Sequence, residues 1–271
     1  MSANEVFLRF VQISDTHISH DENYNRPPAP HTPLAGTHAL LHALRQLPFP
    51  PDFIIHTGDV VYDPHPEAYV KARSLLTDLP APVYYLAGNH DDPHMLQEIL
   101  LGIPEPRLPY DQEFESCGVQ ILCLDSGRLG GDEAPAGRLT EAQLAWLRRK
   151  TYRKDPRPLL VFIHHNPLPQ ADSPWLESMR LQNGEDFHAA LLPARERLRG
   201  VFYGHIHQAM QLQRDGILYC SAVSSWQTFR SDPGESELQF EMAARPGFNV
   251  VSLSAGLTAI RRHSFAVEPN R

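Results

Sequence analysis

Five short polar clusters, each placed directly after an apolar run, constrain this chain more than any other feature of its sequence. The runs before them, such as 53–56, are rich in aliphatic and β-branched residues, which is typical of buried strands. In open α/β sheets, sites form just beyond the carboxyl ends of the strands. We therefore expect an α/β fold in which the clusters meet. They are Asp15-Thr16-His17, Thr57-Gly58-Asp59-Val60, Gly88-Asn89-His90-Asp91, His164-His165-Asn166-Pro167 and Gly204-His205-Ile206-His207.

The rest of the pattern alternates between strands and helices. Apolar runs predict strands over 6–14, 53–56, 83–87, 159–163 and 201–203, and a hairpin of 110–115 with 119–124. Helical spacing and caps predict helices over 37–47, 66–79 and 185–192, one from Pro93 and one from Thr140 to Lys150. The segments 19–36 and 168–180 are expected to be loops. Short antiparallel strands are expected over 210–214, 217–220, 238–243, 248–253 and 257–262.

The composition indicates one globular domain over 1–271. With 271 residues, of which 42% are hydrophobic, the chain can bury a sizeable core. A net charge of −8 argues against a nucleic-acid partner, and no apolar run approaches the ~20 residues of a membrane span. The start lacks the features of a signal peptide, and Cys117 and Cys123 are expected to be buried free thiols. A reducing cytoplasm is therefore the expected location.

The clusters contain oxygen and nitrogen donors and no thiolate. Turns favour Gly, Asp and Asn but not His, so histidines at these strand ends point to metal binding rather than to turns alone. We interpret Asp59 as a carboxylate shared by two metal ions. Such a donor mixture suits Mn, Fe, Zn or Co rather than Ca or a closed cysteine zinc site. The candidate ligands are Asp15, His17, Asp59, Asn89, His164, His205 and His207.

Other histidines receive different interpretations. His90 cannot point the same way as its neighbour Asn89 on an extended backbone, so we expect it to face the substrate from outside the ligand set. His165 is an alternative ligand to His164. His38 and His42 lie four residues apart on a helix, but no third ligand accompanies them, and we expect surface or packing roles.

The motif set resembles that of the calcineurin-like metallophosphoesterase superfamily over roughly residues 10–226. Within it, 175–183 and the Gly204-His205-Ile206-His207-Gln208 run are similar to the class III cyclic nucleotide phosphodiesterases, especially the bacterial 3′,5′-cyclic AMP enzymes. Asn166 departs from this pattern, because many relatives have Pro or His there. The resemblance implies a four-layer sandwich of two mixed β-sheets flanked by α-helices, with strands in 236–263 completing the second sheet.

The resemblance also implies roles for the site residues. Asp15, His17 and His207 would hold one metal, Asn89, His164 and His205 the other, and Asp59 would bridge them, with His90 as the catalytic residue. Asn89, His90 and His207 are also candidate substrate-binding residues. Trp175 and Arg180 are candidate substrate contacts, and Asp125 is expected to be structural or to support the ligands.

The implied function is that of a dinuclear phosphodiesterase that hydrolyses 3′,5′-cyclic AMP to 5′-AMP by attack of a hydroxide bridging two divalent metals. Fe and Mn are the favoured metals, with Zn or Co as alternatives. Two divalent ions, two carboxylates and one hydroxide leave a single positive charge, which matches a singly charged phosphodiester. The expected partner is this small molecule, and the chain could pair as a homodimer.

Two other readings of the function stay open. The first is a phosphodiesterase for 2′,3′-cyclic nucleotides or glycerophosphodiesters, or a phosphomonoesterase. The second is a binding scaffold that has the fold but no activity. The base and sugar would be read by loops such as 19–36, 168–184 and 222–233, and the sequence does not show how.

Overall fold

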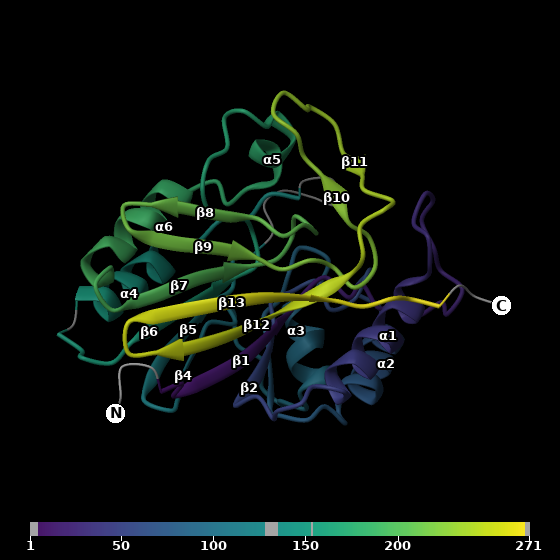
Figure 1. Cartoon of the computed structure of the whole chain (residues 1–271), viewed down its shortest axis with the longest axis horizontal. Coiled ribbons are helices and arrows are strands. Elements are labelled where there is room, and N and C mark those ends of the chain that lie inside the picture. Colours follow the sequence, from purple (N-terminus) through teal and green to yellow (C-terminus); the bar gives the residue numbers. More distant parts are fainter. Residues whose placement is uncertain (1–4, 128–134, 153, 269–271) are drawn as a thin grey trace.

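Two β-sheets packed face to face form the centre of the molecule, with helices against both outer faces (Figure 1). The structure, a computed structural model, describes residues 5–127, 135–152 and 154–268. The expected four-layer sandwich of two mixed sheets flanked by helices is confirmed. None of the helices within the described ranges combines the length and the apolar character that crossing a bilayer requires.

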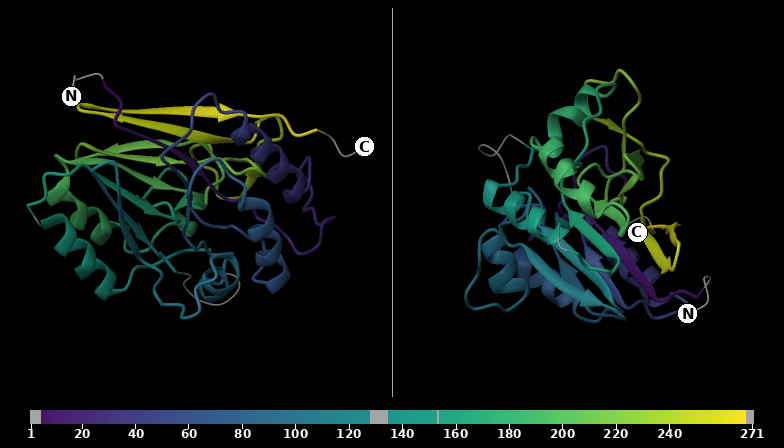
Figure 2. Two further views of the ribbon diagram at one scale, coloured as in Figure 1. Left: turned by 90° about the horizontal axis from the view of Figure 1, so that it is seen from below. Right: turned by 90° about the vertical axis from the view of Figure 1, so that its left-hand side faces the viewer.

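The first sheet has its earliest strand in the middle. Strand β1 (Leu8–Ile13) pairs in parallel with β2 (Phe53–His56), which pairs in parallel with β3 (Val83–Tyr85). On its other side β1 pairs antiparallel with β12 (Gly247–Ser254), and β13 (Leu257–Ser264) forms the edge. The C-terminal hairpin thus lies along the N-terminal strand (Figures 1 and 2) rather than completing the second sheet as expected.

The second sheet is built from the middle of the chain, in the order β4-β5-β6-β7-β9-β8. Strands β5, β6, β7 and β9 run parallel, and the edge strands β4 and β8 are antiparallel to their neighbours. The expected hairpin of β4 with β5 is confirmed. The bounds are β4 Gln112–Ser116, β5 Val119–Leu124, β6 Leu159–Ile163, β7 Leu198–Tyr203, β8 Gln211–Arg214 and β9 Ile217–Ser221.

Aromatic side chains fill the space between the two sheets. Phe10 of β1 stacks on Phe53 at 5.1 Å between ring centroids and meets Phe162 and Phe202 of the second sheet edge-on at 5.5 Å and 5.3 Å. Alternate residues of a strand point to opposite faces, so Val11 instead packs against the helix layer. This shared core fixes the two sheets relative to each other, and with them the strand ends that carry the polar clusters.

The outer layers are amphipathic helices. Helices α1 (Pro33–Arg45) and α2 (Pro66–Leu76) cover the first sheet, and α4 (Glu141–Tyr152) and α6 (Gly184–Leu191) cover the second. The shorter elements are α3 (Pro93–Met95), a π-helical turn at Leu96–Leu100, α5 (Pro174–Met179), a 3₁₀ turn at Leu192–Ala194, β10 (Phe229–Arg230) and β11 (Gln239–Phe240).

Several local expectations were wrong. Helix α1 begins at Pro33 rather than at 37, because Thr32 caps it by accepting a hydrogen bond from the Ala35 N–H at 3.2 Å. Helix α5 occupies part of the expected loop 168–180, and only two residues of 238–243 form a strand. Cys117 is exposed rather than buried, since it occupies the β4–β5 turn with a φ of 49°; Cys123 is buried as expected.

Candidate metal centre

The seven candidate ligands all lie past the carboxyl ends of parallel strands. Asp15 and His17 follow β1, Asp59 follows β2, and the residue Asn89 follows β3 in the first sheet. His164, His205 and His207 follow β6 and β7 of the second sheet. The described structure brings all seven side chains into the protein interior, with none more than 8% exposed. The site is therefore a meeting point of both sheets.

The backbone of this region is held in an unusual conformation. Five of the seven residues have positive φ angles: Asp15 53°, His17 48°, Asp59 54°, His205 70° and His207 50°. A left-handed backbone costs a residue with a side chain roughly 1–2 kcal/mol. Backbone hydrogen bonds hold two of the turns together, from Asp15 N to Gly58 O at 3.0 Å and from His17 N to Asp59 O at 3.1 Å. Strain concentrated in this way is typical of functional sites.

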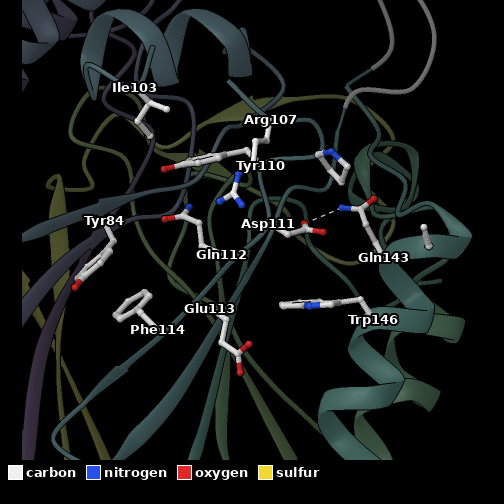
Figure 3. A pocket seen from close by; sticks show the side chains of 12 residues that line it. Tyr84, Ile103, Arg107, Tyr110, Asp111, Gln112, Glu113, Phe114, Gln143 and Trp146 are labelled. Atoms are coloured by element: carbon white, nitrogen blue, oxygen red, sulfur yellow. Dashed lines mark hydrogen bonds between the residues drawn. The ribbon is translucent and has the colours of Figure 1, made fainter. Parts of the chain in front are cut away.

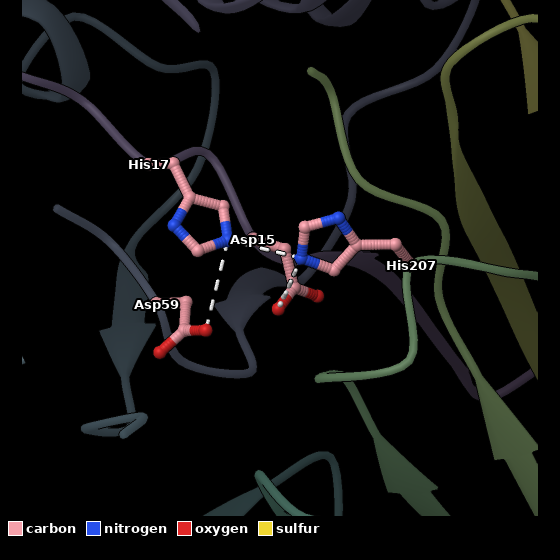
Figure 4. A group of neighbouring side chains, drawn as sticks. All are labelled: Asp15, His17, Asp59 and His207. Carbon is pink, nitrogen blue, oxygen red and sulfur yellow. Dashed lines mark hydrogen bonds and ion pairs between the residues drawn. The ribbon is translucent and has the colours of Figure 1, made fainter. Parts of the chain in front are cut away.

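One group of donors combines Asp15, His17, Asp59 and His207, with one ligand atom from each lying within 4.8 Å of all the others (Figure 4). The Nε2 atoms of His17 and His207 are 2.9 Å apart. His17 Nε2 lies 3.6 Å from Asp59 Oδ2, and His207 Nε2 lies 3.5 Å from Asp15 Oδ1. Oxygen and nitrogen lone pairs thus converge on one small volume.

A second group combines Asp59, His164 and His205 under the same 4.8 Å limit. His164 Nε2 lies 3.4 Å from Asp59 Oδ1 and 3.1 Å from the amide oxygen of Asn89. The two carboxylate oxygens of Asp59 therefore face different histidines, Oδ2 toward His17 and Oδ1 toward His164. Asp59 is the residue that the two groups share.

Contacts behind the rings determine which nitrogen of each histidine is free. His164 Nδ1 lies 2.8 Å from Thr57 O, and His207 Nδ1 lies 3.0 Å from Gln227 O. A ring nitrogen facing a carbonyl must carry the proton, so Nε2 of both rings keeps its lone pair for the centre. His205 is reversed, because its Nε2 donates to Met179 O at 3.1 Å and leaves Nδ1 free. This arrangement fits the coordination of metal ions.

The electrostatics of the site point in the same direction. Burial lowers the pKa of His207 to about 3 and raises the pKa of Asp15 to about 7, since no solvent stabilises either charge. For Asp59 burial acts to raise the pKa, but His164 and His90 outweigh it and the pKa falls well below the ordinary value. For His164 burial acts to lower the pKa, but the Asp59 carboxylate outweighs it and the pKa rises to about 9. The buried carboxylates thus require positive charge close by, and divalent cations would supply it in place of a proton on His164.

His90 lies beside the two donor groups rather than within them. Its backbone N–H donates to Asp59 Oδ1 at 2.9 Å, and its ring meets the His17 ring edge-on at 4.8 Å. Its Nδ1 lies 2.5 Å from the carbonyl oxygen of Tyr62, which fixes the ring and leaves Nε2 without a partner among the described residues. His90 thus lies outside both donor groups, and its role toward the substrate stays a prediction.

Comparison with known proteins agrees with this geometry. The sequence profile of the calcineurin-like phosphoesterases matches residues 8–209, which contain all seven donors. This chain belongs to the calcineurin-like phosphoesterase family. The family and the fold that the sequence predicted are confirmed.

Relatives of this phosphoesterase carry consistent names. The 3′,5′-cyclic adenosine monophosphate phosphodiesterase CpdA of Escherichia coli is 31% identical over 262 residues, covering 93% of this chain and 88% of its own. A 3′,5′-cyclic-nucleotide phosphodiesterase of Nostoc sp. is 28% identical, covering 97% and 96%. A dimetal phosphatase from Danio rerio has the same fold, with a TM-score of 0.72 at 16% identity and coverage of 96% and 97%.

Other predicted residues of this phosphoesterase have structural partners. His165 is buried, with Nδ1 2.6 Å from Ser126 Oγ and Nε2 2.9 Å from Pro135 O, so both ring nitrogens are engaged away from the centre. Asp125 accepts hydrogen bonds from Tyr110 N and Gly127 N, which is a structural role. His38 and His42 lie on the exposed face of α1, as expected.

The candidate substrate contacts Trp175 and Arg180 lie outside the two donor groups. The ring of Trp175 packs edge-on against Phe229 at 5.7 Å, and Phe229 stacks on His207 at 4.3 Å. Arg180 pairs with Glu177 at 2.5 Å and donates to Leu181 O, so its guanidinium is occupied by the protein. The structure thus places Trp175 near the centre only through Phe229.

Two parts of the site gave no clear signal in the sequence. Aromatic residues from separated loops gather around His17, among them Tyr62 and Trp226. Asp91 accepts hydrogen bonds from the backbone N–H groups of Val60, Val61 and Gly88, and thereby ties two ligand-bearing turns together. Asp91 closes the Gly-Asn-His-Asp cluster, and a carboxylate at a turn could have suggested this role.

A wide cavity lies elsewhere on the molecule. It has a volume of about 660 Å³ and is lined by residues of β3, β4 and α4, including Tyr84, Phe114 and Trp146 (Figure 3). None of the seven donors lines it. The size of a cavity is therefore not what identifies the functional site of this phosphoesterase; the convergence of donor atoms is.

Proposed function

We propose that this phosphoesterase hydrolyses 3′,5′-cyclic AMP to 5′-AMP at a centre of two divalent cations. The observation that carries the proposal is the convergence of seven buried donors in two groups that share Asp59. The substrate is supported by the relatives in E. coli and Nostoc, whose names specify 3′,5′-cyclic adenosine monophosphate and 3′,5′-cyclic nucleotides.

In this proposal the two donor groups hold one cation each. When bound, such a pair supplies water acidic enough to be nucleophilic near neutral pH and positive charge for phosphate oxygens. Asp15 and Asp59 would reduce the four positive charges of two divalent cations to two, and one hydroxide nucleophile would reduce them to a single charge, which matches a singly charged diester. The proposed ligands are Asp15, His17 and His207 for the first cation, Asn89, His164 and His205 for the second, and Asp59 for both.

His90 is the proposed proton donor. The Tyr62 carbonyl holds its Nδ1–H, and its Nε2 is left to face a bound phosphate beside His17. In its protonated form the ring can donate from Nε2 to the departing 3′ oxygen, and as a hydrogen-bond donor it can stabilise charge on the phosphate. Asn89, His90 and His207 are the residues we expect nearest the substrate.

The donor set guides the choice of metal, and the cysteines guide the choice of compartment. Imidazole, carboxylate and amide ligands without thiolate suit Mn or Fe, with Zn or Co as alternatives. Three cysteines without a disulfide suit a reducing compartment, and we place the enzyme in the cytoplasm.

Competing hydrolysis rates test the proposal. Mn-loaded protein should turn over 3′,5′-cyclic AMP with a higher kcat/KM than 2′,3′-cyclic AMP or a glycerophosphodiester, and excess chelator should abolish the activity. Faster hydrolysis of either competitor would favour the broader phosphodiesterase. A protein that binds metal but hydrolyses none of these diesters would be a scaffold.

A further inference from the structure

Three aromatic side chains form a wall next to the centre, on the side of His90. The Tyr62 ring lies 5.2 Å from the His90 ring between centroids, and the Tyr24 ring lies 4.4 Å from Tyr62. Trp226 lies 5.8 Å from each tyrosine ring and 5.5 Å from the His17 ring. We call Tyr24, Tyr62 and Trp226 the aromatic wall.

Hydrogen bonds between two separate loops hold the wall in place. Trp226 Nε1 donates to His31 O at 3.0 Å and to Asn25 Oδ1 at 3.3 Å. The ring of His31 in turn meets Ser225 O at 3.2 Å. The segment that carries Tyr24 is therefore fastened to the segment that follows the second sheet's ligands, and the wall is formed before any ligand arrives.

The three rings of the aromatic wall differ in their exposure to solvent. Trp226 is only 3% exposed, whereas Tyr24 and Tyr62 are half-buried. Tyr62 belongs to the same turn as Asp59, and its carbonyl holds the His90 ring. A ligand anchored by its phosphate at the centre would thus meet these two rings at a fixed distance.

Aromatic surface on the other side of the centre is already used by the protein. Phe229 stacks flat on His207, with ring centroids 4.3 Å apart and planes 6° apart. Trp175 at 5.7 Å and Phe240 at 5.5 Å both pack edge-on to Phe229. Phe229, Trp175 and Phe240 are half-buried, as Tyr24 and Tyr62 are, so the side with Tyr24 and Tyr62 is distinguished by its contact with His90 rather than by its exposure.

We propose that Tyr24 and Tyr62 bind the nucleobase of the substrate and so make the centre selective for base-bearing phosphodiesters. This inference rests on the proposed function, which places the phosphate at the cation pair. Flat nucleobases stack on aromatic rings, and one such contact changes affinity by about 5- to 150-fold. Rings read the area of the base rather than its hydrogen-bonding pattern, so purines should bind more tightly than pyrimidines.

The test compares two ligands that differ only in the base. Equilibrium binding of 5′-AMP and of ribose 5-phosphate to the Mn-loaded protein is measured by calorimetry, and the ratio of the two affinities isolates the base. The wild-type protein should prefer 5′-AMP by roughly tenfold or more, and Tyr24→Leu and Tyr62→Leu should each lower the ratio at least about fivefold. A ratio also cancels any effect that Tyr62 has through His90.

Matched variants separate the ring from other causes. Tyr24→Phe and Tyr62→Phe should keep the ratio, because the ring and not the hydroxyl makes the contact. Tyr152→Leu, at an exposed tyrosine at the end of α4, should leave both affinities unchanged. Phe229→Leu tests the opposite side of the centre.

The inference is overturned if both leucine variants keep the wild-type ratio, if the phenylalanine variants lose as much as the leucine variants, or if only Phe229→Leu abolishes the preference. Failure of the proposed function looks different. If the wild-type protein prefers 5′-AMP through Tyr24 and Tyr62 but does not hydrolyse 3′,5′-cyclic AMP, the proposed substrate is wrong and the role of the two tyrosines in binding the base stands. If the wild-type protein turns over 3′,5′-cyclic AMP and both leucine variants keep the wild-type affinity ratio, only the role of Tyr24 and Tyr62 in binding the base is wrong.

Discussion

Asp91→Asn tests whether the centre depends on support from residues that bind no metal. Asp91 Oδ2 accepts hydrogen bonds from Val60 N at 3.1 Å and Gly88 N at 2.9 Å, and Oδ1 accepts one from Val61 N at 3.1 Å. Asparagine has the same shape but only one acceptor oxygen, so its NH₂ group must oppose at least one backbone N–H. The turn carrying Asp59 then loses part of its attachment.

The size of the effect follows from these contacts. A hydrogen bond to a charged acceptor contributes about 1.5–3 kcal/mol, and an opposed pair of donors adds to the loss. Burial raises the pKa of Asp91 to about 7, so the ionised carboxylate is itself costly and offsets part of that loss. We expect the free energy of unfolding at pH 8 to fall by about 2 kcal/mol.

Urea unfolding of the metal-free protein measures this directly. Asp92→Asn is the matched control, because Asp92 caps α3 through His94 N and Met95 N, and asparagine caps helices equally well. The control should stay within about 0.5 kcal/mol of wild type. If Asp91→Asn is as stable as Asp92→Asn, the carboxylate does not support the two turns and the reasoning fails.

Three further predictions concern catalysis, pH and packing. His90→Ala should retain both cations by elemental analysis while kcat falls by roughly 10²- to 10⁴-fold, and exposed His38→Ala should change neither; loss of metal would contradict the role of His90. Burial raises the pKa of Asp111 from 3.8 to about 6. The folded protein therefore gains stability from the protonated carboxyl of Asp111 below pH 3.8, and this gain is lost as the pH rises through about 6. The free energy of unfolding of Asp111→Asn minus that of wild type should therefore be about 1–2 kcal/mol larger at pH 8 than at pH 4. The same difference at both pH values would count against this prediction. Phe10→Ala should lower the free energy of unfolding by about 3–5 kcal/mol in urea, whereas a loss under about 1 kcal/mol would mean that the space between the sheets readily collapses.

The convergence of the donors could be predicted from the sequence because each donor follows a strand. Parallel strands end at the same edge of a sheet, so the pattern alone could place Asp15 near Asp59 in one sheet and His164 near His207 in the other, whereas the meeting of the two edges depends on how the sheets pack. The contacts behind the rings could not be predicted, since the carbonyls of Thr57, Met179 and Gln227 belong to the backbone and carry no residue-type signal.

Other features depended on tertiary context. The strands of 247–264 carry no sequence signal for one sheet over the other, and only the packing decides that β12 pairs with β1. The aromatic wall joins Tyr24 and Trp226 from opposite ends of the chain, and nothing in either local pattern indicates the other. Cys117 lies between two strands that contain apolar residues, but it occupies the hairpin turn itself and is exposed.

Anomalous diffraction from Mn-loaded crystals tests the central claim most directly. The account predicts two peaks about 3.5–4 Å apart, one beside each donor group, with a carboxylate oxygen of Asp59 bound to each. A single peak, or two peaks of which neither contacts Asp59, would contradict it.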